Sequence, residues 1–168
     1  MTQKPTFTQA QLEALAGALG ETGEGLTNPE ITLLIQTCGM KDPGAMTKRI
    51  RIYNAFAEVQ NRRKDRTNVL EFVRQALSPA RYVRDAHRFE PLRANVNRAL
   101  AFCGLLVTEA GKVIPAATVS TLPEAARRAR DLRSDLELRR VHPDVLVFCR
   151  AELLGEDYFH AVQEAVKS

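Results

Sequence analysis

Apolar residues recur every three or four positions in several stretches of the chain, a spacing typical of helices that bury one face. In the first stretch, Thr8 and Gln11 have the spacing of a capping box, which marks a helix start. The apolar positions run to Gly20, which we expect to close this helix in the left-handed conformation. The inward positions predicted for this helix are Leu12, Leu15, Ala16 and Leu19.

The same pattern predicts three further helices. Thr27 and Glu30 form a second capping box ahead of a short helix that ends near Gly39. Thr47 can cap a third helix, and the basic run 61–66 is expected to be a loop between the third helix and the fourth. The predicted inward residues of these helices are Ile31, Leu34, Ile35 and Cys38, then Ile52, Tyr53, Phe56 and Val59, then Phe72, Val73, Ala76 and Leu77.

The pattern changes after Ser78-Pro79, which should stop the fourth helix. Residues 80–90 are rich in arginine and lack periodicity, so we expect an irregular segment. A fifth helix follows and is closed by Gly104. Alternating residues at 105–114, with Gly111 in a left-handed turn position, predict a β-hairpin. The inward positions of the fifth helix are Leu92, Val96, Ala99, Leu100 and Cys103.

The last third is expected to be helical throughout. After a linker at 115–120, Thr121 caps a long charged helix in which Glu124 and Arg128 can pair at four-residue spacing. His142-Pro143 starts another helix, and Asp157 starts the last one, whose broad apolar face favours docking or dimerisation. The sequence thus predicts a mainly α fold: a helical domain over residues 1–118 with one small β-hairpin, followed by a helical segment over residues 119–168.

Composition restricts the class of protein. The chain has 168 residues, 45% of them apolar, and no stretch approaches the roughly 18 apolar residues that span a bilayer. The N-terminus is polar and lacks a signal peptide, so we expect a cytoplasmic protein without a membrane partner. The cysteines are predicted to be reduced core residues: Cys38, Cys103 and Cys149. A metal site joining Cys149 to His142 or His160 lacks local spacing, and no metal or cofactor is expected.

The positive charge is concentrated in the middle of the chain. Residues 48–103 hold thirteen basic and five acidic groups, whereas the flanking thirds have net charges of −3 and −1. Three of the cations stand in the first turn of the third helix, where they oppose the helix dipole unless an anion binds there. A phosphate-binding surface is one interpretation, and ordinary solvated helix faces are the other. The residues predicted to contact nucleic acid are Lys48, Arg49, Arg51, Arg62, Arg63, Lys64 and Arg66.

Known catalytic motifs are missing. The sequence has no glycine-rich phosphate loop, no H-E-x-x-H and no G-x-S-x-G, so nucleotide motors and nucleophilic hydrolases are not supported. Glu156, His160 and Glu164 lie one helical turn apart and could form an acid–base or metal set, although a structural histidine is the simpler interpretation. We predict no catalytic residue in this chain.

Two runs near the C-terminal end carry a family resemblance. Arg140-Val141-His142-Pro143-Asp144-Val145 and Asp157-Tyr158-Phe159-His160-Ala161-Val162, with Cys149 to Leu154 between them, resemble the opening of the Ymh-type domain. Bacterial proteins with this domain are associated with abortive infection and grouped in the HEPN superfamily. Upstream stretches, including Leu122-Pro123-Glu124-Ala125, are similar to the region that precedes such domains.

The resemblance implies a defence protein whose effector part lies elsewhere. The family's ribonuclease signature, an Arg-Asn pair followed by His on one helix, belongs to a continuation past the point that matches Ser168, so we expect a truncated chain. Arg81 and His87 have a similar separation, but Tyr82 stands where Asn is required. Within the matching part, the resemblance marks three residues as a further functional cluster: Asp157, Tyr158 and His160.

Three hypotheses follow for function. The first is a non-catalytic N-terminal sensing or scaffold module of a phage-defence protein, which binds DNA or RNA through a basic face or responds to a phage or host protein. The second is a stand-alone winged-helix-like DNA-binding regulator, although two helices separate the Lys48 helix from the hairpin. The third is a HEPN-type ribonuclease toxin. A homodimer is expected in the first and third cases, because HEPN-type proteins are commonly dimers.

Overall fold

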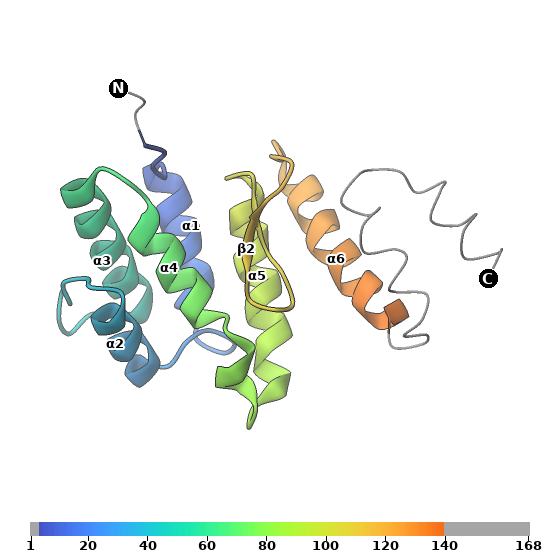
Figure 1. Cartoon of the computed structure of the whole chain (residues 1–168), viewed down its shortest axis with the longest axis horizontal. Coiled ribbons are helices and arrows are strands. Elements are labelled where there is room, and N and C mark those ends of the chain that lie inside the picture. The colour runs from blue at the N-terminus through green and yellow to red at the C-terminus, as the bar shows by residue number, and fades with distance from the viewer. Residues whose placement is uncertain (1–3, 140–168) are drawn as a thin grey trace. The chain divides into compact units, whose positions relative to one another are not determined.

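The computed structural model describes residues 4–139 and is mainly helical, with one two-stranded antiparallel sheet in that part of the chain (Figure 1). This confirms the predicted fold class. The elements are α1 (Gln9–Leu19), α2 (Asn28–Thr37), α3 (Lys48–Arg63), α4 (Thr67–Ala76), α5 (Phe89–Ala101), β1 (Leu105–Val107), β2 (Val113–Pro115) and α6 (Leu122–Arg139), with two short 3₁₀ helices, η1 (Pro79–Tyr82) and η2 (Ala86–Arg88).

The first two helices begin as the sequence predicts. At each start a threonine side chain, that of Thr8 or Thr27, accepts a hydrogen bond from the backbone amide of the third helical residue. The side chain of that third residue, Gln11 or Glu30, accepts a hydrogen bond from the backbone amide of the threonine. The predicted apolar stripes of both helices are buried. Gly39 ends α2 with a φ of 63°, in the left-handed region that glycine adopts without strain.

Gly20 corrects one prediction, because its φ of −96° is not left-handed. Its role is steric instead. A β-carbon at this position would lie 2.8 Å from the amide nitrogen and 2.9 Å from the Cα of Arg49. The end of α1 therefore meets the first turn of α3 backbone to backbone, and only glycine allows that approach.

The segment 61–63, predicted to be a loop, continues α3 and corrects a second prediction. Cations near a helix C-terminus interact favourably with the helix dipole, and Arg62 also pairs with Glu58 one turn earlier at 3.1 Å. The turn to α4 is thus confined to residues 64–66. Thr47 precedes α3 as predicted, but its side chain makes no capping hydrogen bond.

Helices α3 and α4 pack through two aromatic rings. Phe56 and Phe72 are fully buried and meet edge to face, with ring centroids 5.0 Å apart. All predicted inward residues of α4 are buried, as are those of α3 except Tyr53, which is half-buried. Both helices belong to one core cluster that also contains the inner faces of α1, α2 and α5. The central helices therefore share a single core.

The arginine-rich segment 80–90 is more regular than predicted. It contains most of η1 and all of η2, and its last two residues already begin α5. Tyr82 is buried, and its hydroxyl donates a 2.7 Å hydrogen bond to the Ala76 carbonyl oxygen. This contact with the end of α4 orders a stretch that has no apolar periodicity of its own.

The β-hairpin lies alongside α5 (Figure 1) and forms where the sequence predicts it, with Leu106 opposite Ile114. Gly111 in its turn has a φ of 74°, as expected. The buried side chain of Asn97 donates to the Val107 carbonyl oxygen at 3.0 Å and accepts from the Val107 amide at 2.7 Å. Arg93, which is only 4% exposed, donates to the same carbonyl. Two polar side chains of α5 therefore hold the edge of β1.

The chain divides into compact units at 1–129 and 130–168. The division falls later than the predicted boundary at 118, because Ala125 and Ala129 of α6 are buried in the first unit. Glu124 does not pair with Arg128 as predicted; its carboxylate accepts hydrogen bonds from the Ser120 and Thr121 amides, and Arg128 donates to the Ala117 carbonyl. In the second unit, residues 130–139 continue α6, and the predictions for 140–168 lie outside the described residues.

Candidate nucleic-acid interface

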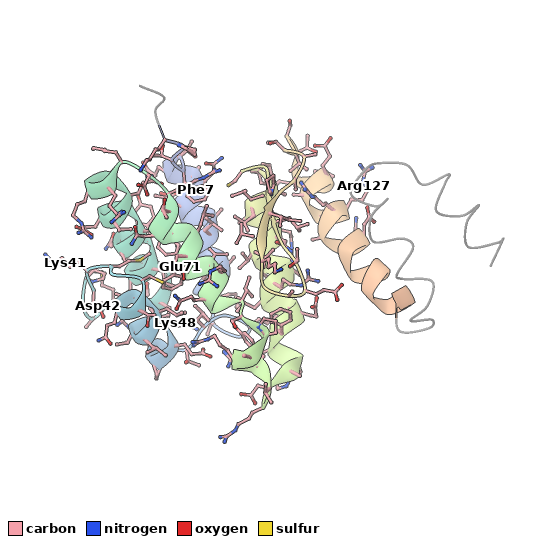
Figure 2. All side chains as sticks on the ribbon, in the orientation of Figure 1. Phe7, Lys41, Asp42, Lys48, Glu71 and Arg127 are labelled. Carbon is pink, nitrogen blue, oxygen red and sulfur yellow. The ribbon has the colours of Figure 1, made fainter. Side chains whose placement is uncertain are left out.

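The seven cations predicted to contact nucleic acid lie at the two ends of α3. Lys48, Arg49 and Arg51 occupy its first turn, and the other four occupy its last turn and the turn that follows. At 1.5 Å per residue the first and last residues of α3 are about 22 Å apart along its axis. In Figure 2 the label of Lys48 marks the first turn of α3, and the label of Phe7 marks the region near its last turn. The two labels lie at opposite ends of the helices. The structure therefore does not join the seven residues into one site.

At the first turn of α3, two of the three cations bind within the protein. The Lys48 ammonium donates to the carbonyl oxygens of Glu21 at 2.8 Å and Leu26 at 2.9 Å, which ties down the loop between α1 and α2. Arg51 forms two hydrogen bonds with the Asp42 carboxylate and a third with the hydroxyl of Thr32, and its side chain is 11% exposed. These two groups hold loops in place through hydrogen bonds within the protein.

The paired guanidinium also affects the acidity of its partner. Hydrogen bonds from Arg51, followed by one from the Gly44 amide, lower the pKa of Asp42 to about 2. The pair therefore stays ionised over the physiological range. Of the three cations in the first turn of α3, only Arg49 is exposed; it lies beside a hollow that Glu13, Ile50 and Tyr53 also line.

The other end of α3 carries a cluster that we call the basic corner. The side chains of Arg63 and Lys64 are exposed and form no salt bridge or hydrogen bond among the described residues, although the charge of Arg63 helps to lower the pKa of Asp65. Arg62 pairs with Glu58, yet its side chain is still 55% exposed. The basic corner consists of Lys4, Arg62, Arg63, Lys64 and Arg66.

One carboxylate, that of Asp65, stands inside the basic corner and has a structural role. Its side chain is only 6% exposed, and it accepts a 2.9 Å hydrogen bond from the Thr67 amide at the start of α4. This hydrogen bond is the main cause that lowers the pKa of Asp65. Lys4 lies 3.7 Å from the same carboxylate, with its side chain 73% exposed. Asp65 therefore supports the turn from within, while Arg63 and Lys64 beside it in the sequence are exposed.

An N-terminal segment, residues 4–7, is fastened beside the basic corner, and we call it the strap. The buried amide of Gln60 accepts from the Phe7 nitrogen at 2.8 Å and donates to the Phe7 oxygen at 2.9 Å. The guanidinium of Arg66 lies 5.2 Å above the centre of the Phe7 ring. The strap thereby brings Lys4 to the basic corner, although 58 residues separate Lys4 from Arg62 in the sequence.

Lys64 adopts an uncommon backbone conformation. Its φ of 58° is the only positive φ of a non-glycine residue in the described part of the chain. A β-carbon makes this left-handed conformation cost about 1 kcal/mol relative to glycine. A helix end selected for stability alone would favour Gly here, as at Gly39 after α2. The lysine therefore occupies this turn at some conformational cost, with its side chain exposed.

Three of the six cations that follow Arg66 in the middle third have carboxylate partners. The salt bridges join Arg74 to Glu71, Arg88 to Glu30 and Arg93 to Glu90. Arg81, Arg84 and Arg98 form no salt bridge among the described residues. The net charge of this third therefore overstates the number of free cations, and the basic corner is where they gather.

The residues considered for other chemistry do not assemble. Arg81 lies in η1 and His87 in η2, so they do not share a helix face. Burial raises the pKa of the Cys38 and Cys103 thiols to about 11, which keeps both unreactive at neutral pH. Among the side chains that the structure describes, no three acidic, His or Cys groups are close enough to hold a metal ion. Asp157, Tyr158, His160 and Cys149 lie outside the described residues.

The helix that precedes the hairpin does not resemble a free recognition helix. Seven residues of α5 are buried, and its face toward β1 is occupied by Arg93 and Asn97. Of its two arginines, only Arg98 is exposed. A winged-helix regulator would need an exposed helix that could enter a major groove.

Comparison with protein families, with curated proteins and with solved structures finds no match to this chain. In the described part of the chain, no helix combines the length and apolar character needed to cross a bilayer. Function is therefore inferred from the basic corner and from the resemblance noted in the sequence.

Proposed function

We propose that this chain is a non-catalytic binding module of a bacterial phage-defence protein and that it contacts nucleic-acid phosphates through the basic corner. The resemblance of residues 140–162 to the opening of the Ymh-type domain supports the biological setting. The local electrostatics of the basic corner support the ligand class. Effector chemistry then belongs to another part of the system, which this module positions or triggers.

The observation that carries the proposal is the exposed, unpaired state of Arg63 and Lys64 at a turn where lysine is conformationally unfavourable. Lys4, Arg62 and Arg66 lie around them, and the carboxylate of Asp65 is turned inward. Phosphate contacts of this kind give affinity and orientation but little sequence preference. We therefore expect binding that depends on backbone charge more than on base sequence.

Titration of short fluorescent single-stranded RNA, single-stranded DNA and duplex DNA tests the proposal directly. Between about 50 and 200 mM salt, the logarithm of the binding constant should fall with the logarithm of salt concentration, with a slope of about −3 to −5 for five phosphate contacts. The double variant Arg63→Gln/Lys64→Asn removes two charges, and asparagine tolerates the left-handed turn. The magnitude of its slope should be smaller by about 1.5 to 2.

A charge-matched variant provides the control. Lys112→Gln/Arg127→Gln removes the same charge from two exposed positions outside the basic corner (Arg127 is labelled on α6 in Figure 2) and should bind as the wild type does. Equal weakening by both double variants would show a non-specific charge effect. That result, or absence of binding by the wild type at about 50 mM salt, would contradict the proposal.

The non-catalytic part of the proposal has its own test. Total RNA incubated with the purified chain should remain intact, because Arg81 and His87 do not form the ribonuclease arrangement. Cleavage that is lost in Arg81→Ala or His160→Ala would replace the proposal with the ribonuclease-toxin hypothesis.

A further inference from the structure

The η1–η2 turn, residues 79–88, carries cations at the opposite end of α4 from the basic corner. The side chains of Arg81 and Arg84 lie in this turn and form no salt bridge or hydrogen bond among the described residues. In Figure 1 the η1–η2 turn joins the lower end of α4 to the start of α5, whereas the turn that contains Lys64 leads into its upper end. Helix α4 therefore connects two places where cations have no carboxylate partner.

The η1–η2 turn is held at its base by contacts with three neighbouring elements. The Tyr82 hydroxyl donates to the end of α4 at 2.7 Å. Arg88 lies 5.8 Å over the centre of the Tyr82 ring and pairs with Glu30 of α2 at 2.9 Å. The turn of the hairpin packs closely as well, because a β-carbon at Gly111 would lie 3.1 Å from the Cδ of Pro79. The side chains beyond this base are therefore displayed from a fixed support.

The outward side chains of the η1–η2 turn are uncovered. Residues 83–87 are all exposed, and Val83 has the highest exposure, 81%, of the large apolar side chains in the described chain. Asp85, the one carboxylate of the turn, forms no salt bridge with Arg81 or Arg84. The Nε atom of Arg81 is buried without a hydrogen-bond partner among the described residues, an arrangement that costs free energy. Exposed residues on a supported loop are a common form of binding site.

The segment that joins the basic corner to the η1–η2 turn is strongly basic. From Arg62 to Arg84 the chain has seven basic and two acidic residues, a net charge of +5. Both carboxylates are engaged within the protein: Asp65 accepts a hydrogen bond at the start of α4, and Glu71 pairs with Arg74. The side chain of Arg74 is still 56% exposed on α4, between the two turns. Positive charge therefore continues along α4 from one turn to the other.

We propose that the η1–η2 turn is a second phosphate contact and that one nucleic-acid strand spans α4 from the basic corner to Arg81 and Arg84. The second contact rests on the proposed function, to which it adds a minimum length of ligand. Helix α4 has 10 residues and is therefore about 15 Å long. Phosphates of a stacked strand follow one another at about 3.4 Å, so about five to eight nucleotides are needed to reach both contacts.

A length series of fluorescent single-stranded DNA and RNA, from about four to about twelve nucleotides, tests the second contact by anisotropy with the full chain. A stacked strand of about four nucleotides covers about 10 Å and can occupy one contact, whereas the longest strand can occupy both within one complex. The double variant Arg81→Gln/Arg84→Gln should weaken binding of the longest strand at least about tenfold and binding of the shortest less than about twofold. For the longest strand, the magnitude of the salt slope should fall by about 1.4.

Two matched variants locate the effect. Arg63→Gln/Lys64→Asn should weaken binding of every strand, because it changes the contact that long and short strands share. Lys41→Gln/Arg127→Gln removes the same charge from two exposed positions outside residues 62–84, both labelled in Figure 2, and should bind every strand as the wild type does. A longer strand offers more binding registers to every variant, so the comparison is made between proteins at each length.

The outcomes separate the second contact from the proposed function. Thermal unfolding identifies any variant that fails to fold, and Arg84→Gln alone repeats the test at a side chain without a hydrogen bond or salt bridge among the described residues. Unchanged binding of the longest strand by the Arg81→Gln/Arg84→Gln variant, or an equal loss at every length, would overturn the second contact and leave the proposed function standing. A wild type that binds no strand of any length would contradict both.

Discussion

At the scale of single residues, the polar side chains divide into those that hold backbone and those that remain free. Lys48 and Arg51 hold loops, and Gln60 and Asn97 each bind both polar groups of one distant residue. A buried carboxamide can do this because it carries a donor and an acceptor side by side, like the backbone itself. The free cations are thereby distinguished from residues of the same type that the fold needs.

The pair of Asp42 and Arg51 leads to a prediction about pH. Its hydrogen bonds hold the pKa of Asp42 at about 2 in the folded protein, below the ordinary value of 3.8. The folded state therefore favours the ionised carboxylate, so this contribution is complete above about pH 4 and is lost as the pH falls toward 2. We expect Asp42→Asn to lower the unfolding free energy by about 1 to 2 kcal/mol at pH 7, with a smaller difference near pH 2.

Urea unfolding across this pH range measures the effect. The control is Asp131→Asn, which changes an exposed carboxylate of α6 and should alter stability little at either pH. A constant difference between the wild type and Asp42→Asn from pH 7 to pH 2 would show that the pair does not act through ionisation.

Residue types in the sequence indicate charge but not its use. Lys48 and Lys64 are both lysines of the basic middle third, yet one donates to two carbonyl oxygens and the other is exposed. The difference depends on loops far away in the chain, which local pattern does not specify. Lys4 was missed as part of the basic corner for the same reason, because Gln60 fastens the strap across 53 residues. The left-handed turn at Lys64 has no signal in the sequence either, because lysine rarely adopts it.

At the scale of elements, the end of α1 and the first turn of α3 meet at close range. The approach depends on Gly20, whose missing β-carbon leaves room for the Arg49 backbone. We expect Gly20→Ala to destabilise the fold by about 1 to 3 kcal/mol, because the new methyl group meets rigid backbone on both sides. Chemical unfolding measures the change.

Gly23→Ala is the matched control for this substitution. A β-carbon at Gly23 would meet only the flexible carboxylate of Glu21, at 3.5 Å, so the variant should retain wild-type stability. Equal stability of Gly20→Ala and the wild type would mean that α1 and α3 can separate without cost.

Capping signals and apolar spacing predicted the elements well where both were present. The starts of α1 and α2, the buried stripe of α4 and the hairpin turn at Gly111 were all confirmed. The prediction was wrong at Gly20 and over residues 61–63, where glycine and a run of cations were interpreted as breaks. In both places the deciding forces were a tertiary contact and the helix dipole, which outweigh local residue preference.

At the scale of the whole molecule, the net charge of +4 says less than its distribution. Five arginines of the middle third pair with carboxylates, and those carboxylates include Glu30 and Asp42 from the acidic first third. Once the chain folds, carboxylates of the acidic first third therefore neutralise part of the positive charge of the basic middle third. Sequence alone could predict the fold class and the polyanion hypothesis, but not which cations stay free.

Binding to the folded state makes a prediction for the molecule as a unit. A ligand that binds only the folded protein stabilises it by about 2.7 kcal/mol when its concentration is about a hundred times Kd. A nucleic acid that binds the basic corner should therefore raise the Tm of the wild type, and the rise should shrink in high salt. Differential scanning calorimetry with and without the strand measures it; an unchanged Tm at saturating strand would contradict binding to the folded state.

The strap has a practical consequence for work with this protein. Lys4 already lies beside Asp65, so residues fused ahead of the chain would start a few positions from the basic corner. A histidine-rich purification tag placed there would bring its own protonated imidazoles near an incoming strand and distort the apparent affinity. Measurements of binding should use protein from which such an extension has been cleaved.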